Sequence, residues 1–426
     1  MAADWQRTSL RDAGVSLIDC DHRTPPPAET GYPYIAIPQL KEGRIDLSDV
    51  RWISPDHFID WTRKAKPQQH DVILSRRCNP GETAYVPAGL ECALGQNLVL
   101  LRSDGSKVFP PFLRWLVRGP DWWEQIGTFI NVGAIFNSLK CADIPNFKMP
   151  LPPLAEQKAI AGVLGALDDK IELNRRMNAT LEEMARALFQ SWFVDFDPVR
   201  AKLDGRLPTG LDKATAGLFP AKFQDSTLGP IPQGWYVGSI YEIADVIYGA
   251  PFASELFNSS REGKPLIRIR DLADESPGVW TPEVQPKGYT VRPGDIVVGM
   301  DGEFRAYLWG GSEAWLNQRV CVFAPKAGFS AVFVRNSIFA RLAEVEATET
   351  ATTVIHIGKN DIDRFTVIVP DAPVAEAFKR LCQPWYDQIV AHKQQSRTLA
   401  ALRDTLLPKL LSGELGVVAA EKEMPA

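Results

Sequence analysis

The chain has 426 residues and a mass of 47.3 kDa, which suggests two or three domains. Hydrophobic residues make up 45% and charged residues 23%, which excludes a disordered, collagen-like or disulfide-scaffold chain. With 47 Lys and Arg against 52 Asp and Glu, the formal charge is −5, so any nucleic-acid surface must be local. The longest apolar runs are far shorter than the roughly 20 residues of a membrane span, and the N-terminus lacks a cationic leader before an apolar stretch. We therefore expect a cytoplasmic protein without a membrane partner.

Motifs for metal binding and catalysis do not emerge along the chain. The six cysteines never form a C-x-x-C pair and the five histidines are dispersed, so we predict no metal site. We find no G-x-x-x-x-G-K-[ST], G-x-G-x-x-G, G-x-S-x-G or H-E-x-x-H motif. A catalytic site assembled from distant residues stays open at this point. The chain nevertheless has the character of a binding protein, and we predict that it holds no catalytic residue and no cofactor.

The predicted elements occur twice in chain order. In the first half, short β-branched segments at residues 34–37, 71–74 and 94–100 are bounded by Gly, Pro and Asp, which is typical of strands. Residues 266–269, 295–298 and 316–322 repeat them in the second half, and residues 143–152 match residues 361–370 at an offset of 218. Trp5 and Trp235 open the two copies. Since half the chain is 213 residues, this period indicates a duplication of whole domains.

A long helix is predicted after each mixed domain. Residues 155–190 contain no proline and carry apolar residues at heptad-like spacing. The apolar positions of this seam are Ile160, Leu164, Leu167, Ile171, Leu181 and Leu188 in the first helix, and Phe378, Trp385, Ile389, Leu399 and Leu406 in the second. Both seams have polar residues at the middle, and Arg403 is a further polar exception. Pairing of the two helices would bring the polar centres together in a parallel or an antiparallel arrangement; alternatively, each helix packs only on its own domain.

Between the two copies, residues 194–234 hold five prolines and many glycines, which predicts a long connector. Residues 219–223 interrupt it with two phenylalanines, which we expect to lie against a domain. Residues 417–426 are expected to form a loose tail.

Taken together, these residues resemble the specificity subunit of type I restriction–modification enzymes. The segments at 151–157, 169–174, 188–196, 228–235 and 406–415 are typical of that family, and the likeness covers essentially the whole chain. The second copy departs from the pattern at residues 370–376, which lack the Leu-Pro-Pro-Leu-x-Glu-Gln sequence of the first. Identical contacts at the two helix starts are therefore in doubt.

The resemblance implies an α+β fold with an internal pseudo-two-fold duplication. It divides the chain into target-recognition domain 1 (1–150), spacer helix 1 (151–196), a connector (197–228), target-recognition domain 2 (229–370), spacer helix 2 (371–415) and a flexible tail (416–426). The two helices would pair as an antiparallel coiled coil. Each mixed domain would read one half of a split, asymmetric target in double-stranded DNA. Two modification subunits would bring S-adenosylmethionine chemistry on adenine, and restriction subunits would bring ATP- and Mg²⁺-dependent cleavage.

Base reading requires donors and acceptors on protruding loops. We predict that such side chains in the first copy are Arg76, Arg77, Asn79, Gln96, Asn97, Asn137 and Lys140. In the second copy they are Arg268, Arg270, Arg305, Gln318, Arg319, Lys359 and Asn360, with Arg268 and Arg270 in an alternating strand. Solvated surface residues, or salt bridging of Arg268 to Asp271, are the alternative.

Two other classes of protein compete with this interpretation. One is a DNA methyltransferase or nuclease that carries its own chemistry, which the missing motifs disfavour. The other is a coiled-coil adaptor without a DNA role, which would not need two elaborate, dissimilar mixed domains.

Overall fold

The computed structural model describes residues 5–133, 136–348 and 356–421. The chain forms two compact units: residues 1–170 with 399–426, and residues 171–398. Each unit holds one mixed domain together with part of each of two long helices, α4 (Leu154–Phe193) and α9 (Ala372–Leu411).

The first mixed domain is built from short strands around a four-stranded antiparallel sheet of order β2-β10-β7-β8. A three-stranded sheet, β6-β3-β9, and the pairs β1-β11 and β4-β5 complete it. The strands are β1 (Arg7–Ser9), β2 (Val15–Asp19), β3 (Tyr32–Ile35), β4 (Leu40–Lys41), β5 (Arg44–Ile45), β6 (Arg51–Ile53), β7 (Val72–Ser75), β8 (Thr83–Tyr85), β9 (Ala93–Leu94), β10 (Leu98–Ser103) and β11 (Lys148–Pro150). The helices are η1 (Ile37–Gln39), α1 (Pro55–Trp61), α2 (Pro110–Leu116), α3 (Pro120–Phe129) and η2 (Ile144–Asn146).

The second mixed domain repeats this topology. Its four-stranded sheet has the order β15-β22-β19-β20, beside a sheet of order β17-β16-β21-β18 and the pair β14-β23. The strands are β14 (Tyr236–Ser239), β15 (Ala244–Tyr248), β16 (Lys264–Ile267), β17 (Trp280–Thr281), β18 (Thr290–Val291), β19 (Ile296–Gly299), β20 (Ala306–Leu308), β21 (Ala314–Leu316), β22 (Val320–Pro325) and β23 (Thr366–Val369). The helices are η3 (Ile240–Glu242), η4 (Ser254–Leu256), η5 (Ile269–Asp271), α7 (Ala331–Thr348) and α8 (Lys359–Ile362).

The predicted duplication is confirmed by these strand orders. β7 and β19 are buried at all four positions and lie inside their sheets, as their apolar sequences require. In both copies the sheet beside the four-stranded antiparallel sheet contains one parallel pair, β3 with β9 and β16 with β21. The aligned residues Ala36 and Arg268 each begin a short 3₁₀ helix directly after the strand. The two copies therefore share their backbone plan in detail.

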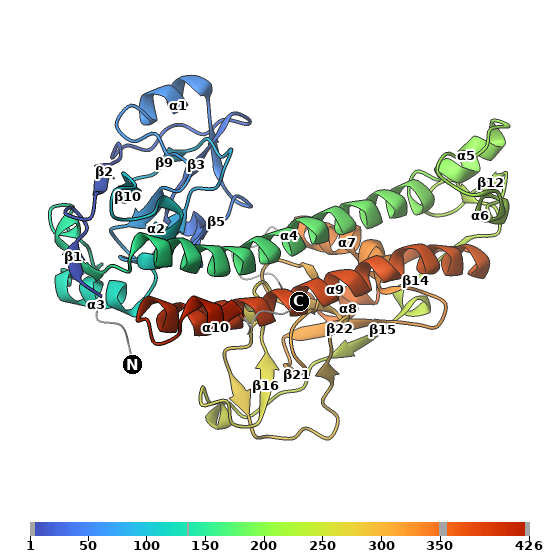
Figure 1. The fold of residues 1–426 in the computed structure, drawn as a ribbon. Helices are drawn as coiled ribbons and strands as arrows, with labels where there is room; N and C mark the ends of the chain where they lie inside the picture. The colour runs from blue at the N-terminus through green and yellow to red at the C-terminus, as the bar shows by residue number, and fades with distance from the viewer. Residues whose placement is uncertain (1–4, 134–135, 349–355, 422–426) are drawn as a thin grey trace. The chain divides into compact units, whose positions relative to one another are not determined.

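In the unit of residues 171–398, α4 and α9 run antiparallel and side by side (Figure 1). Asn174 Nδ2 donates to Ser396 Oγ at 3.2 Å, while further along α4 the ring of Trp192 lies 5.6 Å from that of Phe378. Along the pairing, residue numbers rise on α4 as they fall on α9, so the two helices are antiparallel. The sequence pattern had left this direction open. Asn174 also donates to Gln395, and His392 Nδ1 lies 2.8 Å from Asn178 Oδ1, so the polar centres meet as predicted.

The apolar seam positions lie along this pairing. In the same unit Ile171, Phe378 and Ile389 are buried, and Leu181, Leu188 and Trp385 are partly buried against the core. In the unit of residues 1–170 and 399–426, the buried positions are Ile160, Leu164, Leu167, Leu399 and Leu406.

Arg403, the polar exception in the second seam, is 5% exposed in the unit of residues 1–170 and 399–426. Its Nη1 lies 2.6 Å from Asp168 Oδ1 on α4. Arg114 of α2 approaches the same carboxylate at 3.4 Å. A buried carboxylate therefore balances the arginine, as burial of a charge requires.

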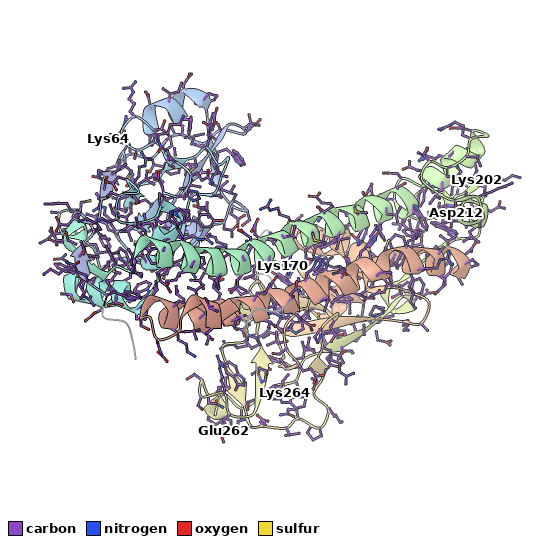
Figure 2. All side chains as sticks on the ribbon, viewed as in Figure 1. Lys64, Lys170, Lys202, Asp212, Glu262 and Lys264 are labelled. Atoms are coloured by element: carbon purple, nitrogen blue, oxygen red, sulfur yellow. The ribbon has the colours of Figure 1, made fainter. Side chains whose placement is uncertain are left out.

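The connector is more ordered than its composition predicts. It contains α5 (Asp197–Leu203), α6 (Lys213–Leu218) and the pair β12 (Phe223–Gln224) and β13 (Ile231–Pro232). Figure 2 labels two side chains that hold it: Asp212 caps α6 by accepting from Ala214 and Thr215, and Lys202 donates to Ala216 O at 3.0 Å. Phe219 is buried against Trp192, as expected for an apolar interruption.

The C-terminal tail is more ordered than predicted. Residues Val417–Glu421 form helix α10 instead of a flexible segment, because Val417 and Ala420 are buried; residues 422–426 lie outside the described residues. In the described part of the chain, no helix combines the length and apolar character needed to span a membrane.

Candidate nucleic-acid interface

Three predicted loop segments of the first mixed domain are joined by backbone hydrogen bonds. The Arg76 N–H, directly after β7, donates to the carbonyl of Asn97 at 2.9 Å. The Leu139 N–H donates to the carbonyl of Arg76 at 2.8 Å. We call residues 76–79, 96–97 and 136–140 the first loop cluster.

The second mixed domain repeats this arrangement atom for atom along the backbone. The Met300 N–H donates to Arg319 O at 3.0 Å, and the Ile357 N–H donates to Met300 O at 2.9 Å. An isolated bridge pairs Arg77 with Ser138 in the first copy, and another pairs Asp301 with His356 in the second. We call residues 300–305, 317–319 and 356–358 the second loop cluster. Arg76, Arg77 and Ser138 thus correspond to Met300, Asp301 and His356.

Side chains in the first loop cluster divide into inward and outward groups. Arg76 is half-buried, and its Nη1 lies 3.5 Å from the carbonyl of Leu139. Arg77 is exposed, with its guanidinium 5.3 Å from the centre of the Phe136 ring. The sequence does not distinguish these two neighbouring arginines, whereas the structure gives them different surroundings.

The other predicted residues of this cluster are polar and accessible. Gln96 is exposed and donates to Thr24 Oγ1 at 2.9 Å. Asn97 forms the turn between β9 and β10 with a φ of 69°, a left-handed conformation that asparagine tolerates well. Asn79 and Lys140 are exposed, and Asn137 is half-buried.

The second loop cluster is a charged network. Asp301 Oδ1 lies 2.6 Å from His356 Nδ1 and 3.5 Å from Arg319 Nη1. Arg305 pairs with Glu303 at 3.1 Å, and Gln318 is exposed. Arginines at this cluster therefore have carboxylate partners, unlike Arg77, for which the described residues supply none.

The prediction for Arg268 and Arg270 is wrong in its structural part. β16 ends at Ile267, and both arginines belong to the following 3₁₀ turn instead of an alternating strand. Asp271 causes this: it accepts from the Arg268 backbone N–H at 3.0 Å and from the Arg268 guanidinium at 3.0 and 3.2 Å. Arg268 is thus engaged by a bidentate salt bridge, and Arg270 is exposed.

Lys359 and Asn360 lie on α8 and are both exposed. Lys359 Nζ lies 2.7 Å from Asp363. This hydrogen bond raises the pKa of Lys359 and lowers the pKa of Asp363. Lys359 thus contacts Asp363 and the Tyr241 ring.

Three residues of the clusters escaped the sequence-based choice of DNA-reading side chains: Phe136, Asp301 and His356. Phe136 is a large hydrophobic residue that is 41% exposed, which a sequence does not reveal. The internal repeat could have indicated Asp301, because it aligns with Arg77 of the first copy.

One group of possible metal ligands, Asp19, Cys20 and His22, lies at the end of β2 with ligand atoms within 4.8 Å of one another. The Cys20 thiol is buried and donates to Gly95 O at 3.2 Å. Burial raises the pKa of Cys20 to about 11, so the thiolate that a metal needs is disfavoured. We assign no metal to this group.

Comparison with known proteins finds similarity to one family. The model of the type I restriction modification DNA specificity domain matches residues 26–183. The type I restriction enzyme MjaIX specificity subunit of Methanocaldococcus jannaschii is 27% identical over 401 residues, covering 87% of each chain. The HindI specificity subunit of Haemophilus influenzae is 23% identical and covers 80% of this chain and 86% of its own. Over most of its length, this chain is similar to type I restriction enzyme specificity subunits.

The solved structures agree on the fold. The crystal structure of a type I restriction–modification S subunit from M. genitalium superposes with a TM-score of 0.54 at 15% identity, covering 96% of each chain. The predicted α+β fold with paired long helices is thereby confirmed. The relatives are specificity subunits, which agrees with the resemblance found in the sequence.

Proposed function

We propose that this chain reads a bipartite, asymmetric DNA sequence, with one mixed domain for each half-site. The single observation that carries this proposal is the pair of loop clusters with the same backbone hydrogen bonds and different outward side chains. Equivalent loops favour equivalent approaches to DNA. Different side chains favour unlike half-sites, so the target is not a palindrome.

Charge supports a local DNA surface. The chain has a formal charge of −5, yet Arg77 and Lys140 are exposed at the first cluster, and Arg305 and Arg319 at the second. Such positions suit phosphate or base contacts, which require cationic or polar side chains on protruding loops. We include Asn79, Gln96, Asn137 and Gln318 with them.

The domain boundaries follow from the same proposal. Residues 1–150 and 229–370 form the two target-recognition domains, 151–196 and 371–415 the spacer helices, and 197–228 the connector. The bounds of α4 and α9, Leu154–Phe193 and Ala372–Leu411, support this division.

We also propose the partners. Two modification subunits supply S-adenosylmethionine-dependent methylation of adenine, and restriction subunits supply ATP- and Mg²⁺-dependent cleavage, in the cytoplasm where the DNA lies. This chain contributes recognition and the paired helices, and binds none of these cofactors itself.

Methylome sequencing of a host with and without this gene tests the proposal. We expect adenine methylation at one split, asymmetric sequence that disappears when the gene is deleted, while the purified chain alone methylates nothing. Methylation by the purified chain would favour an enzyme with its own chemistry. An unchanged methylome, with no sequence-selective DNA binding by the reconstituted complex, would favour a coiled-coil adaptor.

A further inference from the structure

The two loop clusters offer opposite chemistry at one equivalent position. In both copies, a residue turned inward, Arg76 or Met300, carries the two backbone hydrogen bonds that join the loops. The next residue pairs with the opposite loop through an isolated bridge: Arg77 with Ser138, and Asp301 with His356. One copy therefore presents a guanidinium where the other presents a carboxylate.

Arg77 is arranged as a free, oriented cation. Its side chain is exposed, and within the described residues no carboxylate lies within salt-bridge distance of it. The Phe136 ring at 5.3 Å restricts the guanidinium by a cation–π contact. A planar fork with five donors matches the two acceptors, O6 and N7, of guanine in the major groove.

Asp301 has one carboxylate oxygen available as an acceptor, and a neighbouring cation offsets its charge. Its Oδ1 is engaged by His356 and Arg319, whereas Oδ2 accepts no hydrogen bond from the described residues. A bare carboxylate would be repelled by the phosphates, but the adjacent Arg319 guanidinium offsets that charge. A carboxylate oxygen suits the exposed amino group, N4, of cytosine.

We infer that Arg77 selects guanine in the half-site of the first domain and that Asp301 selects cytosine in the half-site of the second. This inference rests on the proposed function and adds the base class that each domain reads. His356 and Arg319 are positioning residues for Asp301, and Phe136 is a positioning residue for Arg77. A good bidentate contact, as expected for Arg77, discriminates against the wrong base by about 5- to 150-fold. Asp301 offers one free oxygen, so its effect should lie toward the lower end of that range.

The test is selection from a randomised duplex library by the full chain with its modification subunits, read by sequencing the bound DNA. Arg77→Ala should abolish one guanine preference in one half-site and leave the other half-site unchanged. Arg77→Lys should retain that guanine preference in weakened form. Asp301→Asn should abolish a cytosine preference in the other half-site only.

Matched controls are Arg206→Ala and Asp204→Asn, which remove an exposed arginine and an exposed aspartate of the connector; among the described residues, their side chains form an ion pair with each other. Both should leave every base preference unchanged. Uniform weakening by Arg77→Ala on all sequences, with a shallower salt dependence, would make Arg77 a phosphate contact and overturn the inference. Unchanged preferences would overturn it equally. A wild-type complex that selects no split sequence would instead overturn the proposed function.

Discussion

The buried ion pair between Asp168 and Arg403 provides a quantitative test of how the long helices pair. Both residues lie in the unit of residues 1–170 and 399–426, are 7% and 5% exposed, and approach to 2.6 Å. Arg403→Met keeps the length of the side chain and removes its charge. Among the described residues, Arg114 at 3.4 Å is then the remaining salt-bridge partner of Asp168.

Breaking a buried pair typically costs about 3–5 kcal/mol, because the remaining charge is stranded. Since Arg114 still compensates Asp168 in part, we expect a loss of about 2–3 kcal/mol. For a unit of roughly 200 residues, this lowers Tm by about 4–12 °C. Asp168→Asn should cost less in the Arg403→Met background than in the native chain, which gives a coupling energy above about 1 kcal/mol.

Differential scanning calorimetry and urea unfolding of the two single variants and the double variant measure this cycle. Arg175→Met is the control, since Arg175 is exposed on α4 and its pair with Glu172 is worth about 0–1 kcal/mol. A loss below about 1 kcal/mol for Arg403→Met, or additive single effects, would refute the reasoning that α4 and α9 share this buried pair.

Four more predictions concern buried groups. Glu275→Gln, which weakens two salt bridges of a buried carboxylate to α9, should cost about 2–4 kcal/mol in urea unfolding, whereas Glu376→Gln at an exposed site should not. Leu399→Asp should destabilise the chain by about 3–5 kcal/mol and impair assembly with modification subunits, while Leu203→Asp, at a 60% exposed position, should do neither. Burial raises the pKa of the four buried cysteines to about 11 or 12, so the exposed Cys78 should be alkylated first at pH 8 by peptide mapping. Because the pKa values of these thiols are raised in the folded state, their contribution to the free energy of unfolding is complete below about pH 9. It should fall as pH rises toward 12.

The repeat made much of the fold predictable. Residues 71–74 and 295–298 were aligned from a few apolar letters, and both became the buried strands β7 and β19. Heptad spacing located both long helices, because a period of 3.5 residues is visible without any tertiary contact. The direction of pairing was not visible, because parallel and antiparallel arrangements both bring Asn174 near the polar positions of the second helix.

Side-chain partners were harder to predict than the fold, because they depend on how the elements pack and turn. Arg403 interrupts the apolar heptad pattern of the second helix, and the sequence does not show that Asp168 of the first helix pairs with it. For Arg268, the sequence left base reading and a salt bridge to Asp271 as alternatives, and the structure shows that Asp271 binds both its backbone N–H and its guanidinium. Exposure of Phe136 and its position beside Arg77 depend on how two loops meet, which no local pattern encodes.

The comparison of the clusters also indicates which positions are free to diverge. The inward residue contributes its backbone N–H and carbonyl to the same two bonds in both copies, whether it is Arg76 or Met300. Those bonds need no particular side chain, so they hold the three loops together while the neighbouring outward side chain changes from Arg77 to Asp301. A change from cation to anion at that position therefore leaves the loop backbone intact. In a protein that reads DNA with these loops, a new target base requires a new outward side chain and its positioning partner, not a new fold.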